Sequence, residues 1–243
     1  MTLHLLHLKD CPIFEQLQME EALLCSDDRN FCIINEGSSP AIVMGISGKP
    51  ELLIHKETLD ANPIPVIKRF SGGGTVIVDE NTLFVTFVFA KSSHSFAAYP
   101  EPIMRWTEEI YKDVFALPEF ALRENDYVIG ERKCGGNAQY IKKQRWLHHT
   151  SFLFNFDPHR MDYLLHPPKT PNYRAGRKHS DFLCTLSEHF PTKEHFITAL
   201  KNTLAQRFIL AAATPADVPF LTSSRCILVH KKSLSKGPKD GRI

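Results

Sequence analysis

The sequence predicts an α+β fold in which mixed, largely antiparallel sheets pack against helices. Short β-rich runs bounded by turn residues recur through the first 156 residues, and three segments carry apolar residues at helical spacing. With 243 residues and 43% hydrophobic content, the chain can bury a substantial core. We expect one domain over residues 1–213, followed by a basic and partly disordered extension over residues 214–243.

The first helix is expected just after Asp10, whose side chain can cap it, with Pro12 in the first turn. Its apolar side carries Ile13, Leu17 and Leu24, which predicts an amphipathic core helix. The more polar positions of this helix include Glu15, Glu20 and Glu21.

Five short β-rich runs follow this helix. Residues 31–35 and 41–44 flank a turn-rich segment and are predicted to form a hairpin. Residues 66–70, 75–79 and 83–89 are predicted to form three more strands. A strand-rich segment over residues 120–156 is expected to complete the sheet.

Two further helices are predicted. One carries Ile103, Trp106, Ile110 and Val114 on a single face and is expected to pack across the sheet. Thr192 can cap the other, whose buried face would be Phe196, Leu200, Thr203 or Leu204, and Phe208.

The segments beside the last helix have weaker patterns. Residues 166–178 hold three prolines and four basic residues and are expected to be irregular and exposed. Residues 226–229 form a candidate strand, and the basic residues 231–242 are expected to be disordered.

Three consecutive glycines, Gly72, Gly73 and Gly74, lie between two of the β-rich runs. Glycine packs nothing and costs backbone entropy, so this run indicates unusual φ values or a close approach of backbone to a ligand. Backbone N–H groups there, with Lys68 and Arg69 beside them, could hold phosphate or carboxylate oxygens. The spacing fits neither of the two common phosphate loops, and a plain turn is the alternative.

The segment from Lys68 to Asp79, read together with Asn125-Asp126 and with Lys133 to Ala138, resembles the lipoate–protein ligase A family. The family's Arg-Arg-x-Ser-Gly-Gly-Gly-x-Val-x-x-Asp is matched from Lys68 with one conservative change, and its Lys-x-x-Gly-Ser/Asn-Ala falls on Lys133 to Ala138. The resemblance covers residues 11 to 210 and implies the catalytic-domain fold of the biotin/lipoate ligases.

This resemblance implies a role for each matched residue. Lys133 would be the catalytic cation, lying against the carboxylate and α-phosphate where charge develops as a lipoate oxygen attacks ATP. Asp126 would hold Mg²⁺ or orient a lysine. Lipoate or its adenylate would be bound by Arg69, Ser71, Gly72, Gly73, Gly74, Asn125, Asp126, Gly136, Asn137, Ala138 and His149.

Two of these sites also have ordinary structural interpretations. Asn125-Asp126 is typical of a turn, and His149 could be a buried, hydrogen-bonded histidine. The sequence also departs from the family pattern. Val78 replaces a histidine, Thr150 replaces the glycine of His-His-Gly-Thr, and residues 45–49 replace Gly-Arg-x-Gln-Asn. These changes are expected to alter the pocket.

The implied function is that of a lipoate–protein ligase, which activates lipoate with ATP to lipoyl-AMP and transfers the lipoyl group to a lysine of an acceptor lipoyl domain. ATP and Mg²⁺ would be substrate and ion, with no permanently bound cofactor. The acceptors would be lipoyl domains of 2-oxoacid dehydrogenase complexes or the glycine cleavage H protein. Larger ligases carry a C-terminal domain for which no room is left here, so we expect an accessory domain or subunit, or transfer from supplied lipoyl-AMP that outpaces activation.

The alternative is a lipoyl or octanoyl transferase that uses a preformed acyl-adenylate or a carrier-bound acyl group. Transfer through a thioester needs an activated thiol, and Cys134 and Cys184 are the candidates. A non-enzymatic basic adaptor would draw only on the tail and on residues 174–178.

Composition argues against other classes of protein. A formal net charge of +2 is too mild to indicate nucleic-acid binding. Six cysteines form no Cys-x-x-Cys pair, which favours a reducing compartment. With no secretory signal and no run of ~18 apolar residues, we expect no membrane association and a location in the cytoplasm or an organellar matrix.

Overall fold

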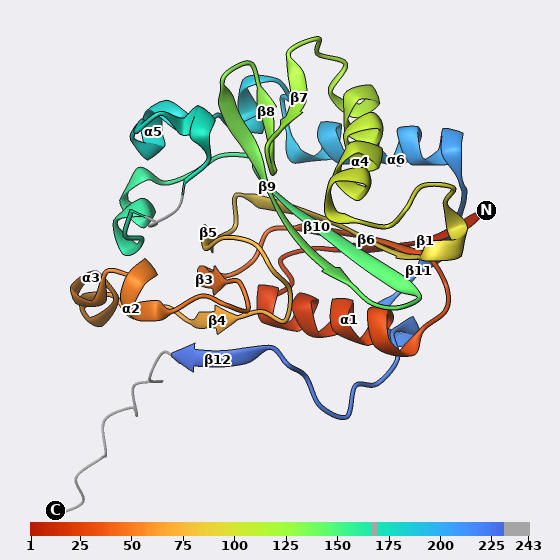
Figure 1. Ribbon diagram of the computed structural model, residues 1–243, viewed down its shortest axis with the longest axis horizontal. Coiled ribbons are helices and arrows are strands. Elements are labelled where there is room, and N and C mark those ends of the chain that lie inside the picture. Colours follow the sequence, from red (N-terminus) through yellow and green to blue (C-terminus); the bar gives the residue numbers. More distant parts are fainter. Residues whose placement is uncertain (167–169, 231–243) are drawn as a thin grey trace, which may run out of the picture.

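The computed structural model describes residues 1–166 and 170–230, so the tail predicted to be disordered lies outside the described residues. Within them, two sheets and the surrounding helices form an α+β fold, as predicted (Figure 1). The larger sheet has eight strands in the order β11-β1-β2-β6-β10-β9-β8-β7, and the smaller has four in the order β12-β4-β3-β5.

The larger sheet is antiparallel except at one edge, where β1 runs parallel to both β11 and β2. Its strands are β1 (Thr2–Leu8), β2 (Phe31–Glu36), β6 (Thr82–Ala90), β7 (Phe120–Arg123), β8 (Asp126–Ile129), β9 (Arg132–Ile141), β10 (Arg145–Leu153) and β11 (Ile209–Ala213). The smaller sheet contains β3 (Ala41–Met44), β4 (Val66–Lys68), β5 (Val76–Val78) and β12 (Ile227–His230).

Three long helices cover the larger sheet (Figure 1). Helices α4 (Pro100–Phe115) and α6 (Lys193–Arg207) pack on one face, and α1 (Ile13–Ser26) packs with the smaller sheet on the other. The remaining short helices are α2 (Pro50–Leu53), α3 (Lys56–Ala61), α5 (His179–Phe182), η1 (Lys91–Ser93), η2 (Pro158–Tyr163), η3 (Asn172–Arg174), η4 (Leu186–Glu188) and η5 (Pro215–Asp217).

The two later helices confirm the predictions from apolar spacing. Ile103, Ile110 and Val114 of α4 are buried in the core that it shares with the sheet. Thr192 caps α6, because its side chain accepts a hydrogen bond from the N–H of His195. In both helices the periodicity of local sequence was enough to identify the buried face.

The predicted hairpin between residues 31–35 and 41–44 is wrong. Both segments are strands, but β2 belongs to the larger sheet and β3 to the smaller one. Gly37 lies between them with φ +110°, and a Cβ there would come within 2.8 Å of the Glu80 carbonyl oxygen. The chain therefore passes from one sheet to the other in this turn, which only glycine accommodates without strain.

The start of α1 also differs from the prediction. Asp10 has φ +51° and lies before the helix, and Pro12 occupies the N-cap position without a side-chain hydrogen bond. The N–H of Ile13 instead donates to Ser38 Oγ at 2.9 Å. A distant serine supplies the acceptor that was expected from the local aspartate.

Of the segment expected to be irregular and exposed, residues 167–169 lie outside the described residues. In the part from 170 to 178, Tyr173 and Arg174 of η3 are buried. Residues 227–230 form β12, which pairs antiparallel with β4.

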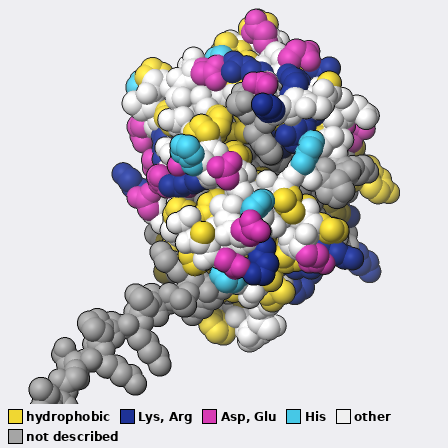
Figure 2. All heavy atoms as spheres, turned by 90° about the vertical axis from the view of Figure 1, so that its left-hand side faces the viewer, with side chains coloured by type: hydrophobic (Ala, Val, Ile, Leu, Met, Phe, Trp, Pro, Cys, Tyr) yellow, Lys and Arg dark blue, Asp and Glu magenta, His cyan; other side chains and the backbone are white. Residues whose placement is uncertain are grey.

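No helix in the described part of the chain is long and apolar enough to cross a membrane. On the face shown in Figure 2, acidic and basic side chains are interspersed among hydrophobic ones.

The buried histidines predict acid instability. Burial, with a smaller contribution from His149, lowers the pKa of His148 to about 3, and burial lowers that of His94 to about 4. Above the unfolded value of about 6.5 both folded and unfolded states are neutral, so protons bind preferentially to the unfolded chain as the pH falls below it. Between that value and the folded pKa of about 3, we expect His148 to lower the free energy of unfolding by up to about 1.4 kcal/mol per pH unit, and the partly buried His94 to contribute less.

Urea unfolding between pH 7 and pH 4 would measure this slope. The variant His148→Gln should flatten it, whereas His189→Gln should not, because His189 is exposed to water. An unchanged slope in His148→Gln would contradict the assignment.

Candidate functional site

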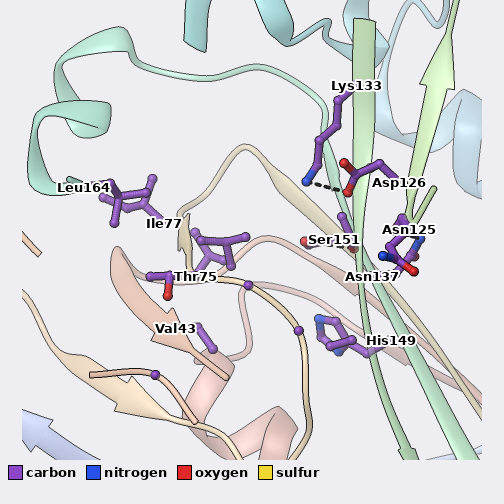
Figure 3. Close-up of a pocket in the computed structure, with 18 of the residues that line it drawn as sticks. Val43, Thr75, Ile77, Asn125, Asp126, Lys133, Asn137, His149, Ser151 and Leu164 are labelled. Carbon is purple, nitrogen blue, oxygen red and sulfur yellow. Dashed lines mark hydrogen bonds and ion pairs between the residues drawn. The ribbon is translucent and has the colours of Figure 1, made fainter. Parts of the chain in front are cut away.

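A cavity of about 990 Å³ lies between the two sheets. One wall is formed by β3, β5 and the glycine loop, and the other by β9 and β10. In Figure 3, Lys133 and Asp126 lie at one end, whereas Val43 and His149 lie at the other. The structure brings together all the residues predicted from the sequence except Ser71, whose carbonyl accepts from the N–H of Ile46.

Arg69 holds the glycine loop in shape. Its Nη2 donates to the carbonyl oxygens of Gly72 and Gly74 at 3.0 and 2.8 Å, and its Nη1 donates to that of Val43 at 3.3 Å. The side chain is buried, and this burial lowers its pKa to about 10, so it stays charged at neutral pH. The guanidinium group of Arg69 therefore holds the loop in a closed shape through its N–H donors.

The loop is also fitted closely to its neighbours. The N–H of Gly72 donates to the Gln139 carbonyl of β9 at 3.1 Å. Gly73 has φ +112°, and a Cβ there would lie 2.6 Å from Arg69 Nη2 and 2.8 Å from the Asn137 carbonyl oxygen. A Cβ on Gly74 would meet nothing within 4 Å. Gly73 is therefore required for packing, whereas Gly74 leaves room in the cavity.

Lys133 is held by an acidic partner at the polar end of the cavity. Its Nζ lies 2.7 Å from Asp126 Oδ1 (Figure 3). The Tyr173 hydroxyl donates to Asp126 Oδ2 at 2.9 Å. Burial, followed by the charge of Asp126, raises the pKa of Tyr173, which keeps the hydroxyl protonated. A Cβ on Gly136 would lie 3.3 Å from Lys133 Nζ, so this glycine leaves space for the ammonium group.

The arrangement around Asp126 bears on the predicted Mg²⁺ site. Both carboxylate oxygens already accept from donors, and the described residues include no cluster of three or more side chains suited to a metal ion. Asp126 would have to release Lys133 or Tyr173 to bind a cation, so these residues do not fit a preformed metal site. The contact with Lys133 fits the other role expected of Asp126, which is to orient a lysine.

Thr150 fixes the amide of Asn137. Its hydroxyl donates to Asn137 Oδ1 at 2.9 Å, and Asn137 Nδ2 donates to the Asn125 carbonyl at 3.0 Å. The family pattern has glycine at the position of Thr150, so this departure adds the hydrogen bond to Asn137 in the cavity wall formed by β9 and β10. Val78, which replaces the family's histidine, lines the cavity and makes it more apolar.

Glu20 forms a buried network with His149. His149 Nδ1 donates to Glu20 Oε1 at 2.8 Å, and the hydroxyl of Thr86 donates to the same oxygen at 2.7 Å. The other oxygen, Oε2, has no hydrogen-bond partner among the described residues. His149 also lines the cavity, so it is both a hydrogen-bonded core histidine and a candidate ligand contact.

Glu20, which contacts the cavity-lining His149 without lining the cavity itself, was not predicted to have a buried role. Glu20 and Glu21 were expected at polar positions of the first helix, but both are buried, Glu21 against Arg225 and Ser224. One signal was available: Glu20 follows Ile13 by seven residues and Leu17 by three, which places it on the apolar stripe. A carboxylate at that position indicates a buried partner.

The two candidate nucleophiles are poorly placed for acyl transfer. Cys134 and Cys184 are both buried, at 0% and 1% exposure. Burial raises the pKa of Cys134, and a hydrogen bond from Cys134 lowers that of Cys184. Since an attacking thiol must be both ionised and accessible, these contacts favour structural roles.

The glycine loop yields a stability prediction. Gly73→Ala should lower the free energy of unfolding by about 1–3 kcal/mol, because it combines a positive φ with two close contacts. Gly74→Ala should change it by less than about 0.5 kcal/mol, because the added methyl group enters open space. Urea unfolding of both variants would check this, and equal losses would contradict the distinction.

Residues 12–209 match the family model of the lipoyl protein ligase A/B catalytic domain. The inactive lipoate–protein ligase 2 of Plasmodium falciparum is 33% identical over 190 residues, which cover 63% of this chain and 49% of that protein. Lipoate–protein ligase 1 of Staphylococcus aureus is 31% identical over 121 residues, covering 49% of this chain and 35% of that protein. The chain thus spans half or less of the length of these two curated relatives.

Three solved structures with 18% identity share the fold over 88% of this chain. The first is protein Ta0514 of Thermoplasma acidophilum with bound lipoic acid, with a TM-score of 0.72 over 90% of that chain. The second is a lipoate–protein ligase A bound with ATP, with a TM-score of 0.72 over 90% of that chain. The third is a bipartite archaeal lipoate protein ligase studied with its E2 lipoyl domain, with a TM-score of 0.73 over 87% of that chain. From the match to the family model, this chain belongs to the lipoyl protein ligase A/B catalytic-domain family.

Proposed function

We propose that this chain is a lipoate–protein ligase that makes lipoyl-AMP from lipoate and ATP and then transfers the lipoyl group to a lysine of an acceptor domain. The observation that carries the proposal is a single cavity with a cation at one end and apolar walls at the other. An acyl chain fits the apolar end, and the developing negative charge of a phosphoryl transfer fits the cationic end.

The apolar end suits the acyl arm of lipoate. Its walls include five apolar side chains, those of Leu17, Val43, Val76, Val78 and Phe84. Glycine at position 74 leaves the cavity open, and the loop that carries it is fixed by Arg69. These residues form a preformed apolar site. Burial of each methylene group of an acyl chain there contributes about 0.8 kcal/mol to the free energy of binding.

The cationic end suits both half-reactions. In the first, a carboxylate oxygen of lipoate attacks the α-phosphorus of ATP, and the bond to the bridging oxygen breaks to release pyrophosphate. In the second, the neutral amine of the acceptor lysine attacks the acyl carbonyl carbon and AMP leaves. Lys133 stabilises the negative charge that develops in both steps, and Asp126 with Tyr173 keeps its ammonium group in position.

The comparisons support the choice of substrates. Related folds have been solved with lipoic acid and with ATP, and one belongs to a system studied with an E2 lipoyl domain. We therefore propose lipoyl domains of 2-oxoacid dehydrogenase complexes or the glycine cleavage H protein as acceptors, with an accessory domain or subunit as a further partner. Mg²⁺ would accompany the ATP phosphates, and the proposed location is the cytoplasm or an organellar matrix.

A transferase that starts from preformed lipoyl-AMP is the second candidate. It is favoured by one specific observation: the relative from Plasmodium falciparum that shares 33% identity is named as inactive. Such an enzyme would need the same cavity and the same lysine, but not the activation of lipoate by ATP. Transfer through a cysteine thioester is disfavoured, because both candidate thiols are buried.

The direct test is to incubate the purified chain with lipoate, ATP, Mg²⁺ and an apo lipoyl domain and to weigh the acceptor by mass spectrometry. A mass increase that requires ATP supports the ligase. An increase only with supplied lipoyl-AMP supports the second candidate. No increase under either condition would refute both.

Lys133→Ala should lower the rates of adenylate formation and of transfer by about 10²–10³-fold, because a preorganised charge is lost at the reacting centre. Lys143→Ala is the matched control, since Lys143 is an exposed lysine in the turn between β9 and β10 and should leave both rates unchanged. Release of pyrophosphate and single-turnover transfer would measure the two steps separately. Wild-type rates in Lys133→Ala would rule out this assignment.

A further inference from the structure

The last part of the described chain packs against the outer side of the binding site. After β11 the chain lies alongside α1, and β12 then joins the smaller sheet beside β4 (Figure 1). Cys226, which precedes β12, is buried in the core that α1 shares with both sheets. Residues 224–230 are therefore packed into the fold at the strand that leads into the glycine loop.

Arg225 contacts three separate segments from this position. Its Nε and its backbone N–H both donate to the carboxylate of Glu21 in α1, the backbone contact at 2.9 Å. Its Nη1 donates to the hydroxyl of Tyr140 in β9 at 2.7 Å. The guanidinium carbon lies 4.7 Å from the centre of the Tyr140 ring and 5.3 Å from that of Phe70. One side chain thus joins α1, β9 and the residues that follow β4.

Two of these contacts adjoin the glycine loop. Phe70 follows Arg69, whose side chain shapes the loop. Tyr140 follows Gln139, whose carbonyl accepts from the N–H of Gly72. The rings of Phe70 and Tyr140 also contact each other edge to face, with their centres 5.6 Å apart. The outer contacts are therefore continuous in sequence with the bonds that hold the loop against β9.

The third contact adjoins the opposite end of the cavity. Glu21 follows Glu20, which accepts from the cavity-lining His149. The Ser224 hydroxyl also donates to Glu21, at 2.7 Å. The Glu21 side chain is 2% exposed, whereas that of Arg225 is 44% exposed, so the ion pair neutralises a buried carboxylate from the protein surface.

We propose that Arg225 is a positioning residue for the acyl site, which ties Phe70, Tyr140 and α1 together on the outer side of the cavity and so fixes the glycine loop against β9. The inference rests on the proposed function in that the ligand is lipoate. Arg225 itself lies outside the described lining of the cavity, so its effect reaches the ligand through the loop. A loop of three glycines has many conformations open to it, and a clamp on its outer side reduces the entropy lost when a ligand orders it.

The first test is binding of lipoate to the full chain by calorimetry. Arg225→Gln should raise the Kd for lipoate by about 5- to 10-fold, because binding must then also order the loop. Arg225→Lys keeps a charge for Glu21 without the planar group that stacks on two rings, and its Kd should be intermediate. An unchanged Kd in Arg225→Gln would overturn the proposal.

The matched control is Arg105→Gln. Arg105 is 52% exposed in its side chain and pairs at 3.0 Å with Glu108, whose side chain is 4% exposed. Both substitutions therefore remove an ion pair between a surface arginine and a buried glutamate of a helix. Both should lower the Tm, but only Arg225→Gln should raise the Kd for lipoate. An equal rise in both variants would reduce the effect to general destabilisation and overturn the proposal.

Hydrogen exchange tests the positioning without a ligand. The amide of Gly72 donates to the Gln139 carbonyl, so its exchange rate reports whether the loop stays on β9. The ratio of this rate to the rates of amides in the centre of β6 should rise by about 10-fold in Arg225→Gln and stay unchanged in Arg105→Gln. A ratio that is unchanged in both variants would contradict the positioning role.

Tyr140→Phe provides a second variant if Arg225→Gln does not fold. It removes only the hydroxyl that accepts from Arg225 and leaves the ring in place. The Kd for lipoate and the exchange ratio should both rise, by about 2- to 3-fold, as for the loss of one weak hydrogen bond. Wild-type values of both quantities in this variant would overturn the proposal.

The outcomes separate this inference from the proposed function. If the exchange ratio responds to Arg225 but the chain binds no lipoate and never modifies a lipoyl domain, the positioning role stands and the ligase assignment fails. If lipoylation occurs and Arg225→Gln matches the wild type in Kd and in exchange, the ligase assignment stands and the inference fails. A changed ratio with an unchanged Kd also overturns the inference, because the loop would then not transmit the effect to the ligand.

Discussion

The cavity depends on the way in which Arg69 closes the glycine loop. A loop of three glycines has no side chains of its own to hold it, so its shape has to come from its surroundings. Arg69 provides this through two carbonyl oxygens of the loop, and β9 provides it through the bond between Gly72 and Gln139. Because the bond between Gly72 and Gln139 joins this loop to β9 of the larger sheet, the loop that Arg69 shapes is also held against the opposite wall of the cavity.

The charged residues around the cavity have different roles: some stabilise the fold and others are placed to contact a ligand. Arg69 is surrounded by carbonyl oxygens and serves the fold, whereas Lys133 is held by a carboxylate that can orient it toward a ligand. Arg174 also lines the cavity, where its Nε donates to the Arg177 carbonyl and its guanidinium packs against the Phe182 ring. A site for a polyanion built in this way keeps part of its charge balanced when empty, which limits the desolvation cost of the folded chain.

The opposite end of the cavity shows a similar balance between burial and polarity. Glu20 lies at the centre of a buried network in which Gln16, Thr86 and His149 all donate to its Oε1, while its Oε2 has no partner among the described residues. Since His149 also lines the cavity, the network fixes the orientation of an imidazole at the end of an otherwise apolar space. Helix α1 thereby contributes both to the core and to the wall of the site.

The sequence alone determined the elements whose signals are local. The buried faces of α4 and α6 follow from helical periodicity, and the strands between residues 31 and 153 follow from β-rich runs between turn residues, whereas β1 and β11 were not predicted. The motif around Gly72 to Gly74 and the segment from Lys133 were enough to identify the family, and the residues that they predicted for the site line the cavity, except Ser71. These features could be predicted because each depends on neighbours within a few turns of chain or on a motif of fixed spacing.

Only the tertiary structure decided features that depend on distant partners. Strands β2 and β3 looked like a hairpin, but their pairing is set by which sheet each one joins, and nothing local records this. Glu20 was expected at a polar position of its helix, but it is buried against His149, which lies 129 residues away. Arg174 looked like part of a basic, exposed loop, although it packs against Phe182 in a cavity wall. A charged side chain is buried or exposed according to what the fold places around it, and the cost of burial is met by contacts that a local pattern does not contain.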